Sequence, residues 1–528
     1  MGGTASHGGR NRHNSYDLGG CVTRASVLSR LGGQRLSGVG ESSLPRSGSV
    51  VDGRYRRIPA LIALATFGVY SLLAVRLHQA FETRGYDLGI FGQYAKHLAH
   101  LTAPDAPYRS KGADLSASGP NLFGDHVSPI LGLLAPLYRL APHVETLLVL
   151  QAALVAGSVF VVAQYGCRRL GVRSGAAIGG AYALSWGVQQ LIGFDFHEVA
   201  FELPLIAMAV VALLEKRTRA AVVWAAALLL VKEDMGLTVF VFGLLLYRDA
   251  PRAGRVLCVL GPMATAVSLF IVIPHFTAAG AHARLTDSST SGSGLGDLAT
   301  HPWQIPGDLV WPPVKLVTVL MILLPTAFLA ARSRLIVLAV PTLLWRFTAD
   351  TPNYWGLSFH YSAVLMPIAF LAMIEAVEAI ETVEAADVLA AAQVMDRTRS
   401  KLIRYAPAFA LTFSFVACAG FPLSHLGRPA FWSPSRHVKA LQAAVRTVPR
   451  NVRVAASSHV VPHLVDADTV YPLLALPPLQ TFGVDWVVVD MQDGDFQTLK
   501  GTALIQEIRQ AGFQPAFSQD DVLVLVHP

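Results

Sequence analysis

Ionisable side chains interrupt this otherwise apolar sequence in a few short clusters. The clusters contain Arg84 and Asp87, Asp125 and His126, Asp195, His197 and Glu198, Lys232, Glu233 and Asp234, and His360. Carboxylate and imidazole groups can accept a proton from a hydroxyl, and cationic side chains can bind phosphate oxygens. The clusters are therefore candidates for acid–base chemistry and for positioning a metal or a phosphate group.

Three of the clusters also fit a purely structural role. Asp87 follows Gly85-Tyr86 and precedes the start of an apolar helix, so it fits both a general base and a helix N-cap. Asp125-His126 also fits a turn with an Asx-type hydrogen bond. Asp195-Phe196-His197-Glu198 fits either a hydrated helix end or a metal- or phosphate-positioning cluster, but it lacks the spacing that specifies zinc.

The cluster Lys232-Glu233-Asp234 is the hardest to explain structurally. It places three charges inside the otherwise apolar segment 220–247. Charged groups at membrane depth cost several kcal/mol unless they find partners or water. We therefore expect these three residues to have a functional or site-organising role.

The composition identifies the environment that these clusters must share. The chain has 528 residues, of which 53% are apolar and only 15% are charged, whereas soluble chains average about 25% charged. This excludes a cytosolic enzyme, a secreted disulfide scaffold and a long disordered protein. The four cysteines show no paired spacing, and the net charge of +7 is better explained by its placement around membrane spans than by nucleic-acid binding.

The apolar runs predict a mainly α, polytopic membrane protein. Counting 220–247 as two arms gives eleven transmembrane or re-entrant helices. The runs are 58–77, 144–165, 175–192, 199–214, 220–231, 235–247, 256–274, 314–331, 335–347, 361–380 and 405–422.

The placement of Lys and Arg predicts the orientation of these helices. Arg54, Arg56 and Arg57 precede the first run, so the N-terminus is expected in the cytoplasm. The later connectors between helices are alternately rich and poor in Lys and Arg. This alternation fits the two sides of the membrane only if 220–247 returns to the side on which it started. Each arm of 220–247 is short for a full span, so we favour a hairpin with a charged apex, with a single span as the alternative.

Three domains are expected. Residues 1–57 form a Gly-, Ser- and Arg-rich arm without a packable apolar run, which indicates a disordered cytoplasmic segment. Residues 58–422 form the membrane domain, with a long first outer loop at 79–143. Residues 423–528 form a small extracytoplasmic α/β domain, with strands at 452–456, 486–490 and 522–526 and helices at 435–446 and 504–511.

In this topology every ionisable cluster lies on the outer side of the membrane or at the hairpin apex that points there. One shared, outward-facing cavity would explain all of them. The sequence lacks Walker A, G-x-G-x-x-G, G-x-S-x-G and protein-kinase patterns. Nothing therefore indicates ATP-driven transport, a dinucleotide cofactor or a soluble hydrolase.

Several motifs together resemble the DUF2079 family of predicted bacterial membrane proteins over about residues 60–528. They are TRGYDLGIFGQY, GDHVSPIL, FDFHE, VKED, FHYSAVLMP, VVPHLVDADTVYPL and DWVVVD. That family in turn resembles the GT-C glycosyltransferases, which use polyprenyl-phosphate sugars at the outer membrane face. The resemblance places Asp87 where those enzymes carry a loop acid that deprotonates or orients the acceptor. Leu88 follows it, so the paired acids of some relatives are missing and metal dependence stays open.

The leading hypothesis is sugar transfer from a polyprenyl-phosphate donor to a cell-envelope acceptor at the bacterial inner membrane, with Asp87 as base. The phosphate would meet Lys232 or Arg84, with His126, His360 and the 195–198 turn as further binding groups. Asp125, Asp195, Glu198, Glu233 and Asp234 would organise the site, and Asp195 and His197 could hold a divalent cation. The alternatives are a lipid or polymer transporter and a non-enzymatic envelope-assembly scaffold. Membrane lipid is an expected partner, and nucleic acid is not.

Overall fold

The computed structural model describes residues 50–109, 121–276, 303, 305–349, 351–389, 397–473, 483–494, 496 and 501–528. Most of the expected basic arm, residues 1–49, lies outside the described residues. The chain divides into two compact units, Met1–Val50 and Val51–Pro528. The helices and the sheet described below belong to the second unit.

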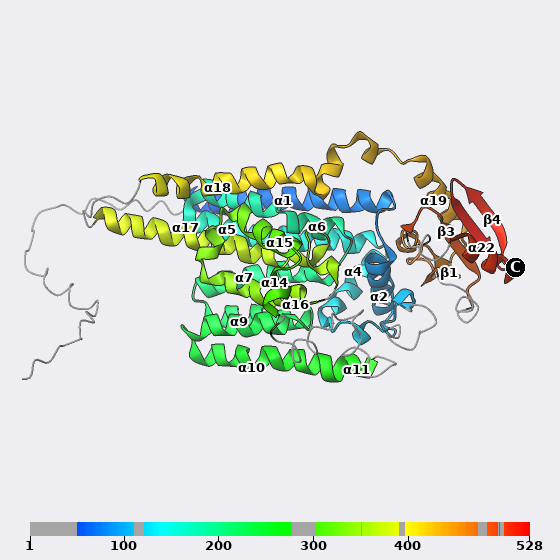
Figure 1. Cartoon of the computed structure of the whole chain (residues 1–528), viewed down its shortest axis with the longest axis horizontal. Coiled ribbons are helices and arrows are strands. Elements are labelled where there is room, and N and C mark those ends of the chain that lie inside the picture. Colours follow the sequence, from blue (N-terminus) through cyan, green and yellow to red (C-terminus); the bar gives the residue numbers. More distant parts are fainter. Residues whose placement is uncertain are drawn as a thin grey trace, which may run out of the picture. The chain divides into compact units, whose positions relative to one another are not determined.

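The described chain is mainly helical, and its long apolar helices lie side by side (Figure 1). Within the described residues, four helical segments are long and apolar enough to cross a membrane, namely Tyr55–Gln79, Glu145–Gly193, Pro251–Phe276 and His360–Thr382. Shorter apolar helices lie between them. The helices are α1 (Val50–Gln79), α2 (Ile90–Ala99), α4 (Leu134–Leu140), α5 (Glu145–Ala183), α6 (Trp186–Gly193), α7 (Glu202–Leu214), α8 (Thr218–Ala227), α9 (Met235–Tyr247), α10 (Pro251–Val267), α11 (Ile273–Phe276), α14 (Ile305–Val310), α15 (Val314–Leu323), α16 (Val340–Thr348), α17 (Leu365–Leu389) and α18 (Arg397–Ala417).

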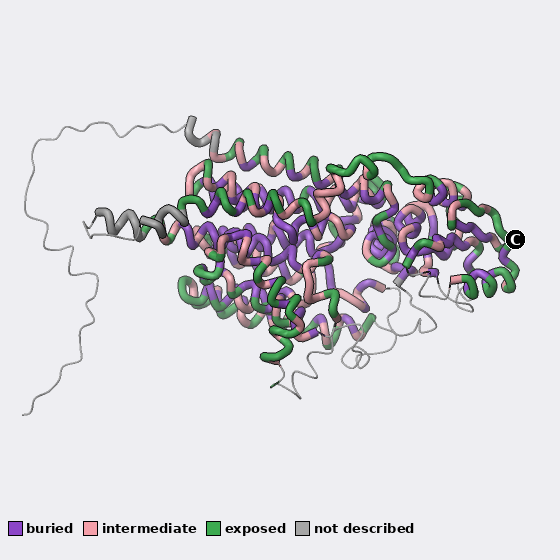
Figure 2. The backbone as a smooth tube through the Cα atoms, turned by 45° about the horizontal axis from the view of Figure 1, so that its top comes forward, coloured by how far each residue is buried: buried purple, intermediate pink, exposed green. Residues whose placement is uncertain are grey.

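Burial separates the central helices from the peripheral ones (Figure 2). The segment His360–Thr382 contains most of α17, and 78% of its most apolar 18-residue stretch is buried. The corresponding stretch of Pro251–Phe276 is only 17% buried. An apolar helix that is mostly exposed is stable only where lipid covers it. We therefore place α17 at the centre of the helical bundle and α10 at its lipid-facing periphery.

Glycine lets two pairs of helices approach closely. In α5, Gly171 has φ 80° and ψ 163°, and the chain reverses there so that Gly175 packs against the backbone of Cys167. Between α9 and α10, a Cβ atom on Gly236 would lie 2.3 Å from the carbonyl oxygen of Gly261. Small residues at such seams are typical of helix packing in membranes.

A chain of ion pairs marks one end of the helical bundle, called here the basic end. Arg168 pairs with Glu215, Arg169 with Glu378, and Arg334 with both Asp249 and Glu375. Because Glu215 precedes α8 and Asp249 follows α9, the segment 220–247 leaves this end and returns to it. The segment is therefore two helices joined by a turn at 231–234, in agreement with the predicted hairpin.

The C-terminal segment forms a five-stranded sheet in the order β2-β1-β3-β5-β4. The strands are β1 (Arg453–Ala456), β2 (Thr469–Pro472), β3 (Trp486–Asp490), β4 (Gln514–Gln519) and β5 (Val522–Val526). β1 runs parallel to β2 and β3, whereas β5 is antiparallel to β3 and β4. Helices α19 (Arg436–Thr447) and α22 (Gly501–Gln510) accompany the sheet, so the predicted strands and helices are present, and β2 and β4 are additional edge strands.

The sheet is fastened to the segment that follows α1. The backbone N–H of Gly85 donates to the carbonyl of Ser458, and the Nζ of Lys96 donates to the carbonyls of Val465 and Asp468. Gln93 adds a hydrogen bond to the carbonyl of Val470. The stretch 458–470 therefore fixes the position of the chain from residue 85 to residue 96, which includes Asp87.

Candidate active site

His197 lies at the centre of a group of ionisable side chains opposite the basic end. Its Nε2 is 3.9 Å from Asp87 Oδ1, and its Nδ1 is 3.0 Å from Glu198 Oε2. The His360 ring stacks on it with the ring centroids 3.6 Å apart. The His197 side chain is only 8% exposed, and burial together with Lys232 and His126 holds its pKa well below the usual value. It is therefore a neutral imidazole between two carboxyl groups.

The turn that carries His197 is held by a side chain from α5. Gln151 donates through Nε2 to the carbonyls of Leu191 and Asp195, and its Oε1 accepts from the backbone N–H of His197. Gln151 is fully buried, so these bonds are shielded from water. Sequence analysis missed this residue because a lone Gln inside an apolar run resembles any other polar interruption.

Asp195 turns toward the backbone of the first loop. It adopts a positive φ of 105°, and its Oδ2 accepts a 2.8 Å hydrogen bond from the N–H of Arg84. Strained backbone of this kind persists only where the surroundings enforce it. Asp195 therefore couples the 194–198 turn to the loop that carries Asp87.

Asp87 lies in a single π-helical turn, Gly85–Gly89, that leads into α2. The turn begins after Arg84 and α2 begins after Gly89, so Asp87 caps neither. A Cβ atom on Gly85 would lie 2.4 Å from the Tyr108 ring, which explains the glycine beside it. Burial, with help from Glu198, raises the pKa of Asp87 to about 7, although Lys232, His126 and Arg84 act to lower it.

The hairpin apex supplies the cation of the group. Lys232 Nζ lies 3.3 Å from Glu198 Oε1, and Glu198 is only 1% exposed. Burial lowers the pKa of Lys232, but the carboxylates of Glu198, Asp234 and Glu233 raise it well above the usual value. Lys232 is therefore charged, and its 13% exposed side chain leaves one edge accessible to a ligand.

Glu233 joins the apex to the second half of the first loop. Its two carboxylate oxygens contact His126 Nδ1 at 2.8 Å and the backbone N–H of Val127 at 3.1 Å. Burial and Lys232 lower the pKa of His126, but Glu233 and Asp125 outweigh them and raise it. His126 and Glu233 therefore form a charged pair next to Lys232.

His360 is held in place by a buried arginine that sequence analysis missed. Arg346 is fully buried and donates to the carbonyls of Tyr354, Gly356 and Tyr361 and to the Ser362 hydroxyl. Both His360 ring nitrogens are buried without a hydrogen-bond partner among the described residues. An Arg inside the apolar run 335–347 was a usable signal, because such residues rarely lack a partner or a function.

The remaining predicted residues border this group. The Arg84 side chain is exposed, and Asp125 ends the short helical turn Leu122–Gly124. Asp234 has a buried Oδ1 that forms no hydrogen bond with any described residue, and it interacts electrostatically with Glu202. Glu202 was also missed, although it follows Glu198 by four residues and so lies on the same helical face.

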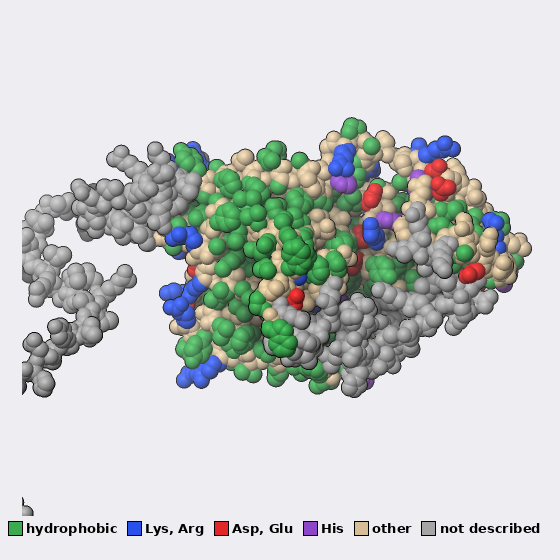
Figure 3. Space-filling view, in the orientation of Figure 1, with side chains coloured by type: hydrophobic (Ala, Val, Ile, Leu, Met, Phe, Trp, Pro, Cys, Tyr) green, Lys and Arg blue, Asp and Glu red, His purple; other side chains and the backbone are tan. Residues whose placement is uncertain are grey.

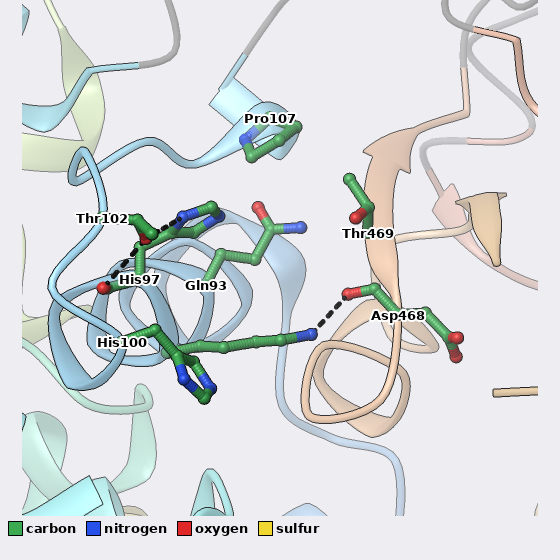
Figure 4. A pocket seen from close by; sticks show the side chains of 8 residues that line it. Gln93, His97, His100, Thr102, Pro107, Asp468 and Thr469 are labelled. Carbon is green, nitrogen blue, oxygen red and sulfur yellow. Dashed lines mark hydrogen bonds between the residues drawn. The ribbon is translucent and has the colours of Figure 1, made fainter. Parts of the chain in front are cut away.

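Figure 3 shows acidic, basic and histidine side chains in a hollow between the apolar surface of the helices and the C-terminal sheet. A cavity of about 270 Å³ lies elsewhere, between α2 and β2 (Figure 4). Its described lining includes Gln93, Lys96, His97, Asp468 and Thr469 and none of the predicted site residues. The candidate site is therefore the cluster around His197, because charge and unpartnered buried nitrogens gather there.

A metal role for Asp195 and His197 stays a prediction. Among the described residues, the one group of three metal-ligand side chains with converging ligand atoms is His143, Glu145 and Asp466. That group lies at the start of α5, apart from the 194–198 turn.

Comparisons with known proteins place the chain in a family. No curated protein matches it significantly. The chain is similar to two crystal structures of ArnT from Cupriavidus metallidurans. The structure bound to undecaprenyl phosphate is 14% identical with a TM-score of 0.49, and the apo structure is 12% identical with a TM-score of 0.47. Each match covers 89% of this chain and 97% of the other. The model of the predicted membrane protein family DUF2079 matches residues 77–524, so the chain belongs to that family.

Proposed function

We propose that this protein is a membrane glycosyltransferase that moves a sugar from a polyprenyl-phosphate donor to an acceptor at the cell envelope. The observation that carries the proposal is the contact of Asp87 with the His197–Glu198–Lys232 group at the end of the apolar helices. A base can activate the acceptor hydroxyl, and a cation can stabilise the phosphate that leaves the sugar.

Asp87 acts as the general base. The acceptor oxygen attacks the anomeric carbon, its proton passes to the Asp87 carboxylate, and the bond from that carbon to the phosphate oxygen breaks. A pKa of about 7 makes Asp87 an effective base near neutral pH, because a base works best when its pKa is near the working pH. The product is an inverted glycoside and free polyprenyl phosphate.

Lys232 and Arg84 bind the phosphate of the donor, and His126 and His360 complete its surroundings. Lys232 is charged and partly exposed, the Arg84 side chain is exposed, and both interact electrostatically with Asp87. The charge of Lys232 is partly balanced by Glu198, so the singly charged phosphodiester of the donor is bound and the polyprenyl phosphate product is then released. A divalent cation held by Asp195 and His197 would supply further charge stabilisation.

The isoprenoid tail remains in the lipid beside the helices. The site lies at the end of helices whose outward faces are apolar, so a lipid-linked sugar reaches it without leaving the membrane. The basic end marks the cytoplasmic side. The site, the loop 79–143 and the C-terminal α/β domain 423–528 then face outward at the bacterial inner membrane.

The interior next to the site favours transfer over transport. Most described residues between the site and the basic end are buried and apolar, among them Ala207, Val210, Ile368 and Leu371, and the buried hydroxyls of Ser158 and Tyr182 bond to one another. A transported polar substrate would need polar groups along this route. The buried ionisable residues among those described instead gather at the end that holds the site.

The test is release of polyprenyl phosphate by the purified protein. It is incubated with a panel of polyprenyl-phosphate sugars and envelope acceptors, with and without a divalent cation. Wild type should release polyprenyl phosphate only when an acceptor is present, and Asp87→Asn should be slower by about 10²–10⁴-fold. The matched control is Asp105→Asn, in the same loop and outside the site, which should keep wild-type activity.

Two outcomes would overturn the proposal. Equal activity of Asp87→Asn and wild type would remove Asp87 as the base. Delivery of chemically unchanged lipid-linked sugar across a vesicle membrane, without release of polyprenyl phosphate, would assign the protein to transport instead.

A further inference from the structure

Three metal-ligand side chains from two segments far apart in the sequence converge away from the candidate active site. His143 lies between α4 and α5, Glu145 is the first residue of α5, and Asp466 belongs to the stretch that precedes β2. One ligand atom from each lies within 4.8 Å of the other two. The group therefore connects the membrane helices to the C-terminal α/β domain.

The spacing of two of these atoms already suits a bound cation. His143 Nδ1 lies 3.4 Å from Asp466 Oδ2. Zinc binds His nitrogen and carboxylate oxygen at roughly 2.0–2.2 Å, and two ligands of a tetrahedral site are then about 3.4 Å apart. The other ligand atoms must close by about 1 Å, which side-chain rotation of Glu145 allows because that side chain is 41% exposed.

The surroundings orient the group as they do in metal sites. The Tyr138 hydroxyl donates to Asp466 Oδ1 at 2.5 Å and leaves Oδ2 facing His143. Such outer hydrogen bonds fix the ligand carboxylates of metal sites.

A buried histidine points at the group from a fourth direction. His78 is only 4% exposed, and its Nε2 lies 3.9 Å from Glu145 Oε1. Its Nδ1 is hydrogen-bonded with Thr83, and its ring stacks on His463 with the centroids 4.1 Å apart. The ring is therefore held with Nε2 directed toward Glu145, and no hydrogen bond to that nitrogen is found among the described residues.

We propose that His143, Glu145 and Asp466 bind a divalent transition-metal cation of the zinc class, with His78 or water as the fourth ligand. Imidazole nitrogen together with carboxylate oxygen suits zinc, whereas calcium and magnesium take oxygen ligands in larger number. The site does not touch Asp87, and it stands whether or not the proposed function is correct.

The cation fastens the α/β domain to the loop that carries Asp87. Asp466 lies in the stretch whose neighbours Val465 and Asp468 accept hydrogen bonds from Lys96. A Cβ atom on Gly89 would lie 2.6 Å from Val461 in the same stretch. A cation that fixes Asp466 to the start of α5 therefore also restrains the loop with Gly89 and Lys96, because that loop contacts the stretch that carries Asp466.

The experiment measures binding of Zn²⁺ alone to the purified full-length protein after treatment with a chelator. Wild type should bind one Zn²⁺ at this site, with a higher melting temperature and slower hydrogen exchange in 85–96 and 458–470. His143→Ala and Asp466→Asn should each weaken Zn²⁺ binding at least about 10-fold, since loss of an outer-shell partner alone costs 10–100-fold. His100→Ala, which removes an exposed histidine from the same region, should bind as wild type does.

His143 is 67% exposed, so His143→Ala should melt as wild type does in the absence of metal, and weaker binding then reports a lost ligand. Unchanged Zn²⁺ affinity and stoichiometry in both His143→Ala and Asp466→Asn would overturn the proposal. Binding that is lost only in His197→Ala would also overturn it and would place the cation at the 194–198 turn.

Discussion

Replacing Glu198 with Gln should move the acidic limb of the pH–rate profile toward lower pH by about one unit. Burial and Glu198 both raise the pKa of Asp87, to about 7. A base must be deprotonated to act, so wild-type activity should rise with pH and reach half of its plateau near pH 7. Removal of the neighbouring negative charge lowers the pKa of Asp87, and the half-maximum follows it downward.

The magnitude follows from the geometry around His197. Asp87 and Glu198 lie on opposite sides of one imidazole ring, at 3.9 and 3.0 Å from its two nitrogens. Across the ring the two charges are at most roughly 9 Å apart, and at an effective dielectric constant of about 20 they repel by about 1.8 kcal/mol, or ~1.3 pH units. The substitution also frees Lys232 from its partner, which shifts the limb in the same direction.

The assay is acceptor-dependent release of polyprenyl phosphate from pH 5 to 9. The control is Glu82→Gln, which removes an exposed negative charge close to Asp87 in sequence and should leave the limb in place. A limb that stays near pH 7 in Glu198→Gln would refute the electrostatic coupling. A wild-type rate that does not depend on pH would refute Asp87 as the titrating base.

Three further predictions test the parts that hold the site. Gln151→Leu should reduce kcat by about 10²-fold in a folded protein, because misplacement of a catalytic group by 1 Å can cost that much; circular dichroism with the turnover assay checks both points. Glu233→Ala should release His126 and Val127 from the hairpin apex, seen as faster hydrogen exchange around 121–128 and slower turnover, whereas exchange unchanged from wild type would contradict it. Gly236→Val should destabilise the protein by several kcal/mol through a clash with Gly261, measured as a lower melting temperature. Gly157→Val is the matched control and should cost much less, because a Cβ atom on Gly157 has nothing within 4 Å.

The mainly helical fold and the four long apolar helices could be predicted because spans with few charges leave a strong hydropathy signal, whereas the count of eleven helices stays a prediction. The hairpin 220–247 was predictable for the same reason, since Lys232, Glu233 and Asp234 interrupt it and its arms are short. Strands β1, β3 and β5 were predictable as short apolar runs. β2 and β4 were missed because they lie at the sheet edges and carry little alternation of apolar and polar residues.

Membrane composition also explains why many site residues could be found from sequence. Ionisable groups are rare near apolar spans, so Asp87, His197, Glu198 and Lys232 stood out without any knowledge of their contacts. Their pairing could not be predicted, because it joins segments that are 34 residues apart for Glu198 and Lys232 and 110 residues apart for Asp87 and His197. Uncharged partners such as Gln151 gave no comparable signal.

The long-range contacts explain how the site depends on the C-terminal domain. The loop with Asp87 follows α1, yet its backbone is held from one side by Asp195 and from the other by Ser458. Neither contact is local, so the loop is fixed only after α5–α7 and the sheet have both docked. A truncation after residue 422 should therefore leave the helices able to insert but leave Asp87 poorly positioned. Lys232 can still bind the lipid-linked donor when Asp87 is poorly positioned. Such a truncation should therefore reduce turnover far more than donor binding.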